Sequence, residues 1–576
     1  MGLINTALHI GQSAITSYQS ALSVVGNNIA NAANPDYTRQ RAVLQPVIGS
    51  PLPGGIQPGG GVALTSLERI INEALEGRLR LALGDAESAR IQSNTLTQIE
   101  TSFNELTEND LSTMMSRLFN LFQDVQNNPT DVGLRSVAIG NAAALADALR
   151  IRQQGLNGLA DELNTQIVAP TQQADELARQ IADLNIRVVE AEAGGQIAGA
   201  LRDTRDALLR ELAEIVEITV RTQESGTVSV FVGNETLVQF GNSRGLTAQT
   251  VVDGDLVREE VHFGDNSGQA EIRGGLLEGL ITARDTYVTG AADVINRLPV
   301  GLVSALNEIH TNGQGLDGFG SVTGTYAVTD PTLALNDSAA GLTFVPQTGS
   351  FFVSITDTAG GQTVSYRIDV DLDGQNGDDT TLNSLAAQID GTVANLTAAV
   401  GVDGKLTLTA DAGFEITFGH DGAAARDDTS NVLAALGINT LFQGIDASDI
   451  AVNDVIAARP ELLAASAVNI NGDGANMGLL ADAGNNNVAE LNNATVFNFY
   501  NQMLGEMGVQ TASAAARLDG AAATSEALQQ QRASISGVNL DEEAVDLLRY
   551  QRAFQGAARF TSMIDRLIAE LLSIAR

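Results

Sequence analysis

Apolar side chains recur along residues 2–33 at alternating steps of three and four. That spacing predicts the single stripe of a coiled-coil helix, because both steps return to one helix face. Gly11 is the one lapse in the stripe, and Asn34-Pro35 predicts the end of the helix. The predicted stripe consists of Ile4, Leu8, Ile15, Tyr18, Leu22, Val25, Ile29 and Ala32.

The carboxyl end of the chain repeats this pattern without a lapse. Asn539 is the predicted N-cap of the second helix, and the acidic residues 541–543 fall where the helix dipole favours negative charge. The second stripe consists of Tyr550, Ala553, Ala557, Phe560, Ile564, Leu567, Leu571 and Ile574.

Between the two ends the pattern changes several times. Residues 66–217 read as largely helical, with breaks near 127–129 and 194–195. Alternating apolar and polar residues over 218–263 predict strands joined by turns, and helical spacing returns over 274–311.

The stretch from 326 to 459 is rich in Thr, Val, Gly and Asp. Strands are predicted at Phe351–Thr356, Val364–Leu372 and Leu406–Thr409. Acidic residues far outnumber basic ones here, which favours an inserted, solvent-facing domain. Helical composition resumes after Pro460.

The predicted fold class is therefore α+β and multidomain, with long coiled-coil ends, a helical trunk and a β-rich inserted outer domain. The predicted domains are a terminal coiled coil (1–40 with 535–576), a mainly helical trunk with a small β region (41–325 with 460–534, β at 218–263), and the outer domain (326–459).

An apolar stripe has to be buried against something. Burying a large apolar side chain contributes about 1.5–3 kcal/mol, while ordering one residue's backbone costs about 1–2 kcal/mol. Two terminal helices alone would therefore be marginal. We expect both ends to be mobile in the free subunit and ordered in a polymer, although periodicity alone also allows an intramolecular helical bundle.

The formal charge of -37 disfavours binding to nucleic acid or to an anionic membrane surface. The chain has no Cys and a single Lys, Lys405. Residues 1–20 lack the basic start and apolar core of a signal peptide, and no apolar run of about 18 residues predicts a membrane span. An extracellular role would need export without a cleaved signal.

Three short motifs suggest chemistry, and their context argues against each. Residues 241–245 match G-x-S-x-G but precede a predicted strand instead of a helix. Residues 313–318 match G-x-G-x-x-G but follow a helix. Residues 369–374 resemble the start of a calcium loop, but its twelfth position is Thr380 and its carboxylates alternate with apolar residues on one strand.

The histidines are scattered, and none lies in a zinc-protease motif. They are expected to be surface or packing residues: His9, His262, His310 and His420. No catalytic, cofactor-binding or metal-binding residue is predicted.

Both ends resemble a known family. Residues 20–40 (SALSVVGNNIANAANPDYTRQ) resemble the amino-terminal signature of bacterial flagellar rod, hook and hook-associated proteins. Residues 536–554 (SGVNLDEEAVDLLRYQRAF) resemble the carboxyl-terminal signature of the hook-associated members that join hook to filament. Segments 202–212 and 306–310 resemble the trunk of those members. The signature residues are Asn27, Asn28, Asn31, Asn34, Pro35, Tyr37, Val538, Asn539, Leu540, Glu542, Glu543, Tyr550 and Gln551.

The resemblance implies a structural subunit of the hook–filament junction, exported through the flagellar secretion channel. It implies as partners the hook protein, the second hook-associated protein, copies of the chain and a flagellar export chaperone. Asp36 departs from the family pattern, which usually has Gly there, and fits a type I turn or a strained left-handed conformation. The alternatives are another axial member, such as hook protein or flagellin, and a surface adhesin acting through 326–459.

Overall fold

The computed structural model divides the chain into two compact units, each assembled from separated segments. Unit 1 contains 1–95, 161–284 and 512–576, and unit 2 contains 96–160 and 285–511. The described residues are 2–49, 59–103, 110–194, 197–254, 256–265, 268–375, 377–418, 428–468 and 470–574.

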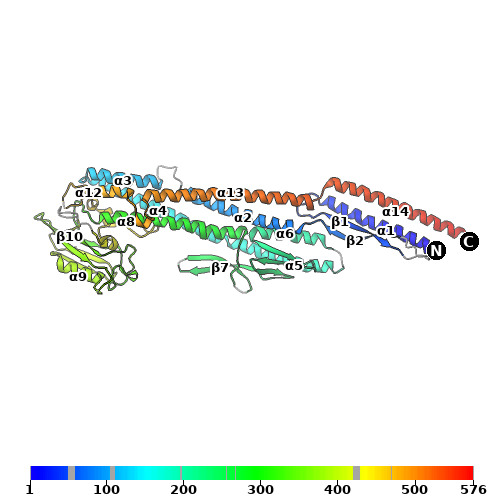
Figure 1. Ribbon diagram of the computed structural model, residues 1–576, viewed down its shortest axis with the longest axis horizontal. Helices are drawn as coiled ribbons and strands as arrows, with labels where there is room; N and C mark the ends of the chain where they lie inside the picture. The colour runs from blue at the N-terminus through cyan, green and yellow to red at the C-terminus, as the bar shows by residue number, and fades with distance from the viewer. Residues whose placement is uncertain are drawn as a thin grey trace. The chain divides into compact units, whose positions relative to one another are not determined.

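The two ends of the chain lie side by side in unit 1 (Figure 1). Helix α1 (Gly2–Ala30) packs along helix α14 (Leu540–Ile574), which confirms both predicted terminal helices. Strands β1 (Gln40–Ile48) and β2 (Gly59–Arg69) form an antiparallel hairpin that also packs on α1. The hairpin corrects the expectation of helix from residue 66.

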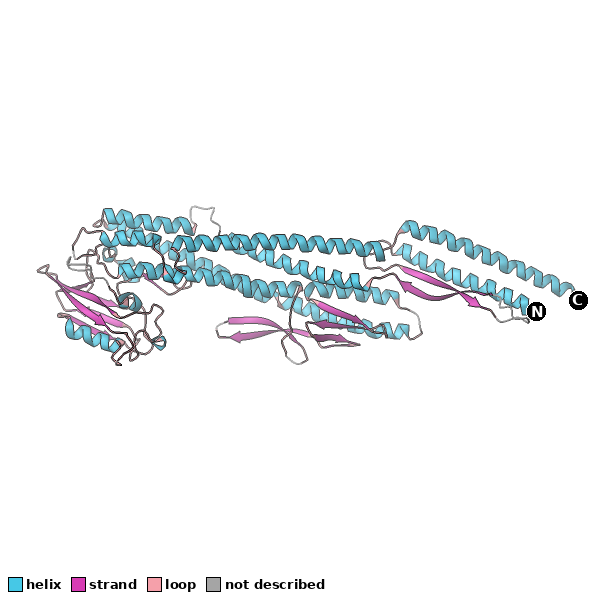
Figure 2. Cartoon of the chain, in the orientation of Figure 1, coloured by secondary structure: helices cyan, strands magenta, loops and turns pink. Residues whose placement is uncertain are grey.

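The rest of unit 1 combines helices with a small sheet and a separate hairpin (Figure 2). Asn185 of α5 is fully buried, and its side chain bonds to both main-chain groups of Val228 and to the Phe240 carbonyl, which attaches α5 to the sheet. The sheet order is β3-β4-β5-β6, and β7 pairs with β8. The elements are α2 (Glu73–Ser102), α5 (Val168–Glu192), α6 (Gly199–Ile215), β3 (Ile218–Thr222), β4 (Val228–Val232), β5 (Glu235–Gln239), β6 (Asn242–Ser243), β7 (Leu246–Asp253), β8 (Leu256–Phe263) and α7 (Gly275–Thr282). The predicted β region of 218–263 is confirmed.

Helices dominate one part of unit 2. The predicted break at 127–129 separates α3 from α4, and a π-helix at 283–288 interrupts the predicted helix at 274–311. The buried positions Ala138, Ala142, Leu145 and Leu149 give α4 one packed face. The elements are α3 (Leu111–Asn127), α4 (Val132–Gln166), η1 (Ala283–Val288), α8 (Thr289–His310), α12 (Ala475–Asp482) and α13 (Val496–Ser536); α2, α4 and α13 contribute residues to both units.

One helical stretch, 132–192, contains an 18-residue window with mean hydropathy 1.2, although no apolar run was expected there. Of that window, 44% is buried inside the structure. The recurrent buried positions of α4 are those of an amphipathic helix packed against protein.

The β-rich part of unit 2 contains two three-stranded sheets, β11-β10-β14 and β12-β13-β9, and the pair β15-β16. All three predicted strands are present, although the second ends at Val370 instead of Leu372. Helix α9, which packs on β12, was not predicted. The elements are β9 (Ser321–Thr323), η2 (Ser338–Ala340), β10 (Gly349–Asp357), β11 (Thr363–Val370), α9 (Leu382–Thr392), β12 (Leu396–Val400), β13 (Leu406–Ala410), β14 (Phe414–Thr417), α10 (Val432–Leu436), β15 (Phe442–Gln443), β16 (Ala451–Val452), α11 (Asp454–Ala458), η3 (Pro460–Leu462), η4 (Ala483–Asn485) and η5 (Ala489–Leu491).

The core of unit 2 contains a fully buried histidine. His310 Nδ1 lies 2.7 Å from the Asn439 carbonyl oxygen, and its Nε2 accepts the Ala464 amide at 3.0 Å. Burial lowers the pKa of His310 to about 4, with the Asn439 hydrogen bond opposing the shift. The ring is therefore neutral and acts as a packing residue, as expected.

We expect unit 2 to lose stability as the pH falls below 6.5. The unfolded chain takes up a proton on His310 near pH 6.5 and the folded chain only near pH 4, so protonation favours unfolding between these values. The expected loss at pH 5 is about 2 kcal/mol, measured by chemical denaturation. His310→Gln, which can keep both hydrogen bonds, should flatten this dependence; an equally steep profile in the variant would contradict the assignment.

Candidate assembly interface

The α1–α14 pair is held by an apolar contact and by one close approach. Ala21, Val25 and Tyr550 form its buried core, and the Tyr18 and Tyr550 ring centroids lie 6.4 Å apart. A Cβ at Gly11 would collide with the Thr561 side chain. The lapse in the first stripe is therefore a point where α14 approaches α1 too closely for a side chain.

A polar cluster ties the end of α1 to the start of α14. The Asn28 amide donates to Glu543 Oε2 at 3.0 Å and to the Gln40 carbonyl at 2.9 Å, and its Oδ1 accepts the Tyr37 hydroxyl at 2.8 Å. Arg39 Nε donates to Glu543 Oε1 at 2.7 Å. We call these five residues the terminal clasp. Burial, followed by the nearby Asp203 and Glu543 carboxylates, raises the pKa of Tyr37 to about 12.

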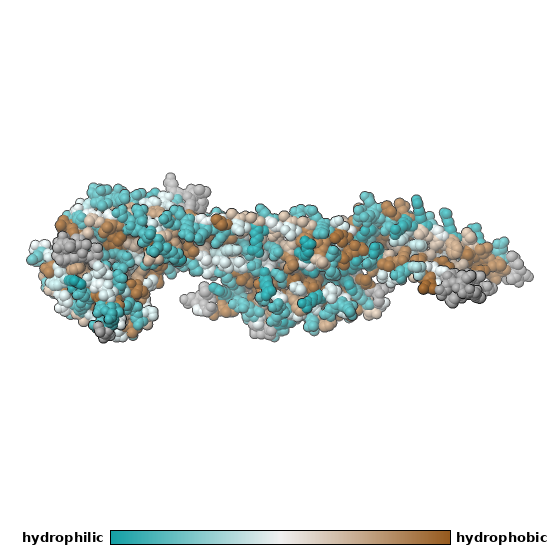
Figure 3. All heavy atoms as spheres, viewed as in Figure 1, coloured by the Kyte–Doolittle hydropathy of each residue, from teal (hydrophilic) through white to brown (hydrophobic). Residues whose placement is uncertain are grey.

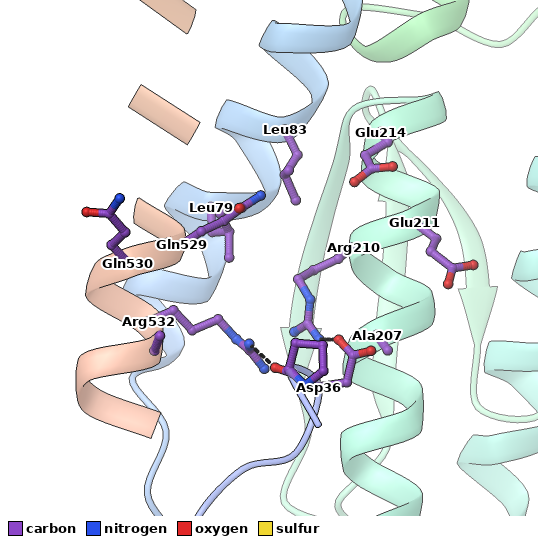
Figure 4. Close-up of a pocket in the computed structure, with 12 residues that line it drawn as sticks. Asp36, Leu79, Leu83, Ala207, Arg210, Glu211, Glu214, Gln529, Gln530 and Arg532 are labelled. Atoms are coloured by element: carbon purple, nitrogen blue, oxygen red, sulfur yellow. Dashed lines mark hydrogen bonds and ion pairs between the residues drawn. The ribbon is translucent and has the colours of Figure 1, made fainter. Parts of the chain in front are cut away.

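A second charged cluster surrounds the turn that follows α1, and Figure 4 shows three of its members, Asp36, Arg210 and Arg532. Glu76 of α2 accepts from Arg210 of α6 at 3.2 Å and from Arg532 of α13 at 2.7 Å. Arg210 also pairs with Asp36 at 2.7 Å, and Arg532 donates to the Pro35 carbonyl at 2.7 Å. The turn after α1 is thus bound to α6 and α13, and Glu76 of α2 joins the two arginines that hold it.

The end of β2 is fixed to α6 by a third set of ion pairs. Arg69 contacts Asp203 at 2.5 Å and Asp206 at 2.7 Å, and all three side chains are mostly buried. Burial by itself would lower the pKa of Arg69. The nearby carboxylates of Asp206 and Asp203 have the larger effect, so the pKa is raised. The carboxylates are three residues apart on α6, so they face the same partner.

The backbone of Asp36, in the turn after α1, does not adopt the left-handed conformation. Asp36 is not among the residues with positive φ, the Tyr37 amide donates to the Asn34 carbonyl, and the Asp36 amide donates to Asn34 Oδ1. This agrees with the type I alternative predicted for Asp in place of Gly. The carboxylate pairs with Arg210, which a glycine cannot do.

A short break at residues 537–539 separates α13 from α14. Asn539 caps the helix as predicted, because its Oδ1 accepts the Asp541 amide at 3.0 Å. A Cβ at Gly537 would meet the Ala533 carbonyl oxygen, so this break requires a residue without a side chain.

The predicted stripe residues differ in how well a single chain covers them. Val25 and Tyr550 are buried, while the first stripe's exposed member, Ile29, is 37% exposed. In α14 exposure rises toward the carboxyl end, from 37% at Phe560 to 50% at Leu571. Figure 3 shows apolar side chains at the surface of this helix pair. Half-buried members are Ile4, Leu8, Ile15, Tyr18, Leu22, Ala32, Ala553, Ala557 and Ile564; Leu567 is 46% exposed, and the Ile574 side chain lies outside the described residues.

The family-signature residues separate into two groups. Asn28, Tyr37 and Glu543 meet in the clasp; the side chains of Asn27 and Asn31 extend it along α1, and Asn34 and Pro35 form the turn. Leu540, Glu542 and Gln551 are exposed, Val538 is half-buried, and Glu542 pairs with Arg39 at 2.7 Å. Residues that were not singled out are Arg39, Arg69, Glu76, Asp203, Asp206, Arg210 and Arg532.

The three motifs have structural roles. Ser243 precedes β7, which confirms that no helix follows it, and 313–318 begins after the end of α8. Oxygens of Asp371, Asp373 and Asp379 lie within 4.8 Å of one another, in a loop instead of on the predicted strand face. Asp373 and Asp379 each accept a loop amide. His9 is exposed, His262 lies 3.2 Å from Glu260, and His420 lies outside the described residues.

Comparisons with known proteins match both the trunk and the carboxyl end. Residues 96–325 match the model of the flagellar hook-associated protein FlgK helical domain, and 529–574 match that of the flagellar basal body rod FlgEFG protein C-terminal region. Flagellar hook-associated protein 1 of Salmonella typhimurium is 28% identical over 99% of both chains. The protein of the same name is 27% identical in Escherichia coli, over 99% of both chains, and 23% identical in Bacillus subtilis, over 98% of this chain and 97% of that one.

Among solved structures, the flagellar hook junction protein FlgK from Burkholderia pseudomallei is 16% identical, with a TM-score of 0.49. It covers 80% of this chain and 100% of its own.

Paired terminal helices and a rod-type carboxyl end define a flagellar axial protein, one that assembles with other axial components. Within that class, the chain is similar over nearly its whole length to flagellar hook-associated protein 1. It is an extracellular, structural component of the hook–filament junction and not an enzyme. The predicted family and function are confirmed.

Proposed function

We propose that the chain joins hook to filament by completing its two terminal stripes against neighbouring axial subunits. Copies of the chain would cover them laterally, the hook protein on one side and the second hook-associated protein on the other. Before export, a flagellar chaperone would cover the α14 stripe. The outer domain, 326–459, would stay outside these contacts, as its acidic composition favours.

The exposed apolar residues of α14 carry this proposal. Phe560, Leu567 and Leu571 lie on the stripe that begins at the buried Tyr550, yet each is between 37% and 50% exposed in the single chain. Fully burying a side chain of this size contributes about 1.5–3 kcal/mol, so covering these three supplies a driving force that the monomer lacks.

The terminal clasp supports the same mechanism by holding the stripes in register. It sits where α1 ends and α14 begins, so it fixes one end of the pair while the distal parts remain open to neighbours. The first half of the pair would then be preformed for assembly, and only the distal half would be ordered by it.

We expect the double substitution Leu567→Asp and Leu571→Asp to abolish motility in a strain that lacks the native gene. Both side chains are already about half exposed, so the free protein should unfold at an unchanged denaturant midpoint. The measurements are swimming and recovery of the chain in sheared flagella.

The matched control is Ser562→Asp with Ala569→Asp, which adds the same charge to exposed positions on the opposite face of α14. This control should leave more motility than the stripe variant. Full motility with charged residues in the stripe would contradict the proposed function.

A further inference from the structure

Unit 1 contains a groove of about 500 Å³ next to the turn at Pro35 and Asp36. Its walls come from α2, α6 and α13, and the apolar side chains of Leu79 and Leu83 face into it (Figure 4). A space of this size is in the range that binds a whole ligand or several atoms of a partner side chain.

The arginines along the groove are paired with carboxylates, but two of its glutamates have no such partner in the part of the chain that the structure describes. Arg210 and Arg532 are neutralised by Asp36 and Glu76, as described above. Glu211 and Glu214, on the α6 wall, have no ion-pair or hydrogen-bond partner among the described residues. Burial raises the pKa of Glu214, and the neighbouring carboxylates of Glu87 and Glu211 raise it further, while the nearby Arg210 opposes the shift. A cation placed beside Glu214 would relieve this repulsion.

Helix α14 carries positive charges that lack ion-pair partners among the described residues. Residues 547–569 contain four arginines and one aspartate, in a chain whose formal charge is -37. Arg552, Arg559 and Arg566 are exposed at a spacing of seven residues, and none has an ion-pair partner among the described residues. They therefore form one basic row along the helix surface.

We propose that the groove of one copy receives an arginine from the basic row of α14 on a second copy. The guanidinium would pair with Glu214 and Glu211, and its aliphatic stem would lie against Leu79 and Leu83. The inference rests on the proposed function and adds to it one specific contact between copies. Charge complementarity selects this occupant, because the unpaired carboxylates and the unpaired arginines belong to the same chain and the chain assembles with axial components.

Cross-linking in assembled flagella tests the contact, because the chain has no cysteine of its own. Two variants are co-expressed: Gln530→Cys at the groove, and Gln555→Cys on the exposed surface of α14 between Arg552 and Arg559. A short thiol cross-linker should give a dimer that contains both variants. Val402→Cys, on a fully exposed loop, replaces Gln555→Cys as the control and should give none.

Glu214→Gln then separates a docking role from a structural one. Because Glu214 has no described hydrogen bond, the variant should unfold at an unchanged midpoint while the cross-linked fraction falls about fivefold or more. Glu190→Gln, an exposed glutamate on α5, should leave the yield unchanged.

Flagella that contain the chain but give no groove-to-α14 dimer would overturn the inference and leave the proposed function standing. A cross-link from Gln530→Cys to a different protein would overturn the choice of a second copy. Failure of the cysteine variants and the native chain alike to enter flagella would overturn both proposals.

Discussion

Glu543→Ala is expected to destabilise unit 1 by about 2–4 kcal/mol, because it leaves two donors of the terminal clasp without their acceptor. The Glu543 side chain is 2% exposed and accepts from Asn28 and Arg39. Breaking a buried charge pair from one side costs about 3–5 kcal/mol. The expected value is lower because Arg39 is 24% exposed and keeps its pair with Glu542.

The neighbouring residue provides the matched control. Glu542 pairs with the same arginine at the same 2.7 Å distance, but its side chain is 58% exposed. Exposed pairs contribute about 0–1 kcal/mol, so Glu542→Ala should change stability little. Chemical denaturation gives the free energies, and hydrogen exchange of the first turn of α14 locates the effect. Equal losses in the two variants would mean that burial of Glu543 does not matter.

The terminal helices were predictable because their signal is local. Steps of three and four mark one helix face wherever the partner lies, and both terminal helices were predicted correctly on that basis. Only one of the two neighbours of α1, helix α14, was predicted. Ser17 and Val24 are buried one position away from the stripe, and the Ser17 hydroxyl donates to the Val62 carbonyl of β2, so α1 packs between α14 and the hairpin.

The β1–β2 hairpin escaped prediction because its alternation is irregular. The register shifts between Val43 and Leu44 and again between Pro46 and Ile48, and a proline inside a run argues against a strand. Helix α9 had a readable signal that the surrounding Thr- and Gly-rich composition obscured. Its buried Leu382, Leu385 and Ile389 are spaced by three and four, after a capping box at Thr381.

The clasp and the Glu76 cluster could not be read from the sequence. Their partners are far apart in the chain: Arg39 lies 504 residues from Glu543, and Glu76 lies 456 from Arg532. A charged residue is solvated by default, and only the folded chain shows which ones are buried together. The signature resemblance identified Asn28, Tyr37 and Glu543 as a set but did not say that they touch.

Unit 2 has a buried charged residue of its own that joins separate segments of the chain. Arg135 of α4 is 1% exposed, and its guanidinium donates to the Pro129 carbonyl, at 2.9 Å from Nε and 2.5 Å from Nη2, and to the Leu463 carbonyl. Burial lowers its pKa to about 10, with Glu461 opposing the shift, so the side chain is charged at neutral pH. It connects the loop between α3 and α4 to the segment after η3.

Arg135→Ala is expected to destabilise unit 2 by about 3–5 kcal/mol. The substitution leaves the Pro129 and Leu463 carbonyls without their donor, at about 1–3 kcal/mol for each buried group, and it opens a cavity. Arg135→Lys keeps the charge but loses the planar fork, so its cost should fall between those of alanine and the native residue. Arg117→Ala, on the exposed side of α3, should change stability by less than about 0.5 kcal/mol. Calorimetry of the full chain measures all three, and a lysine variant as unstable as the alanine variant would show that the fork, and not the charge, holds the two segments together.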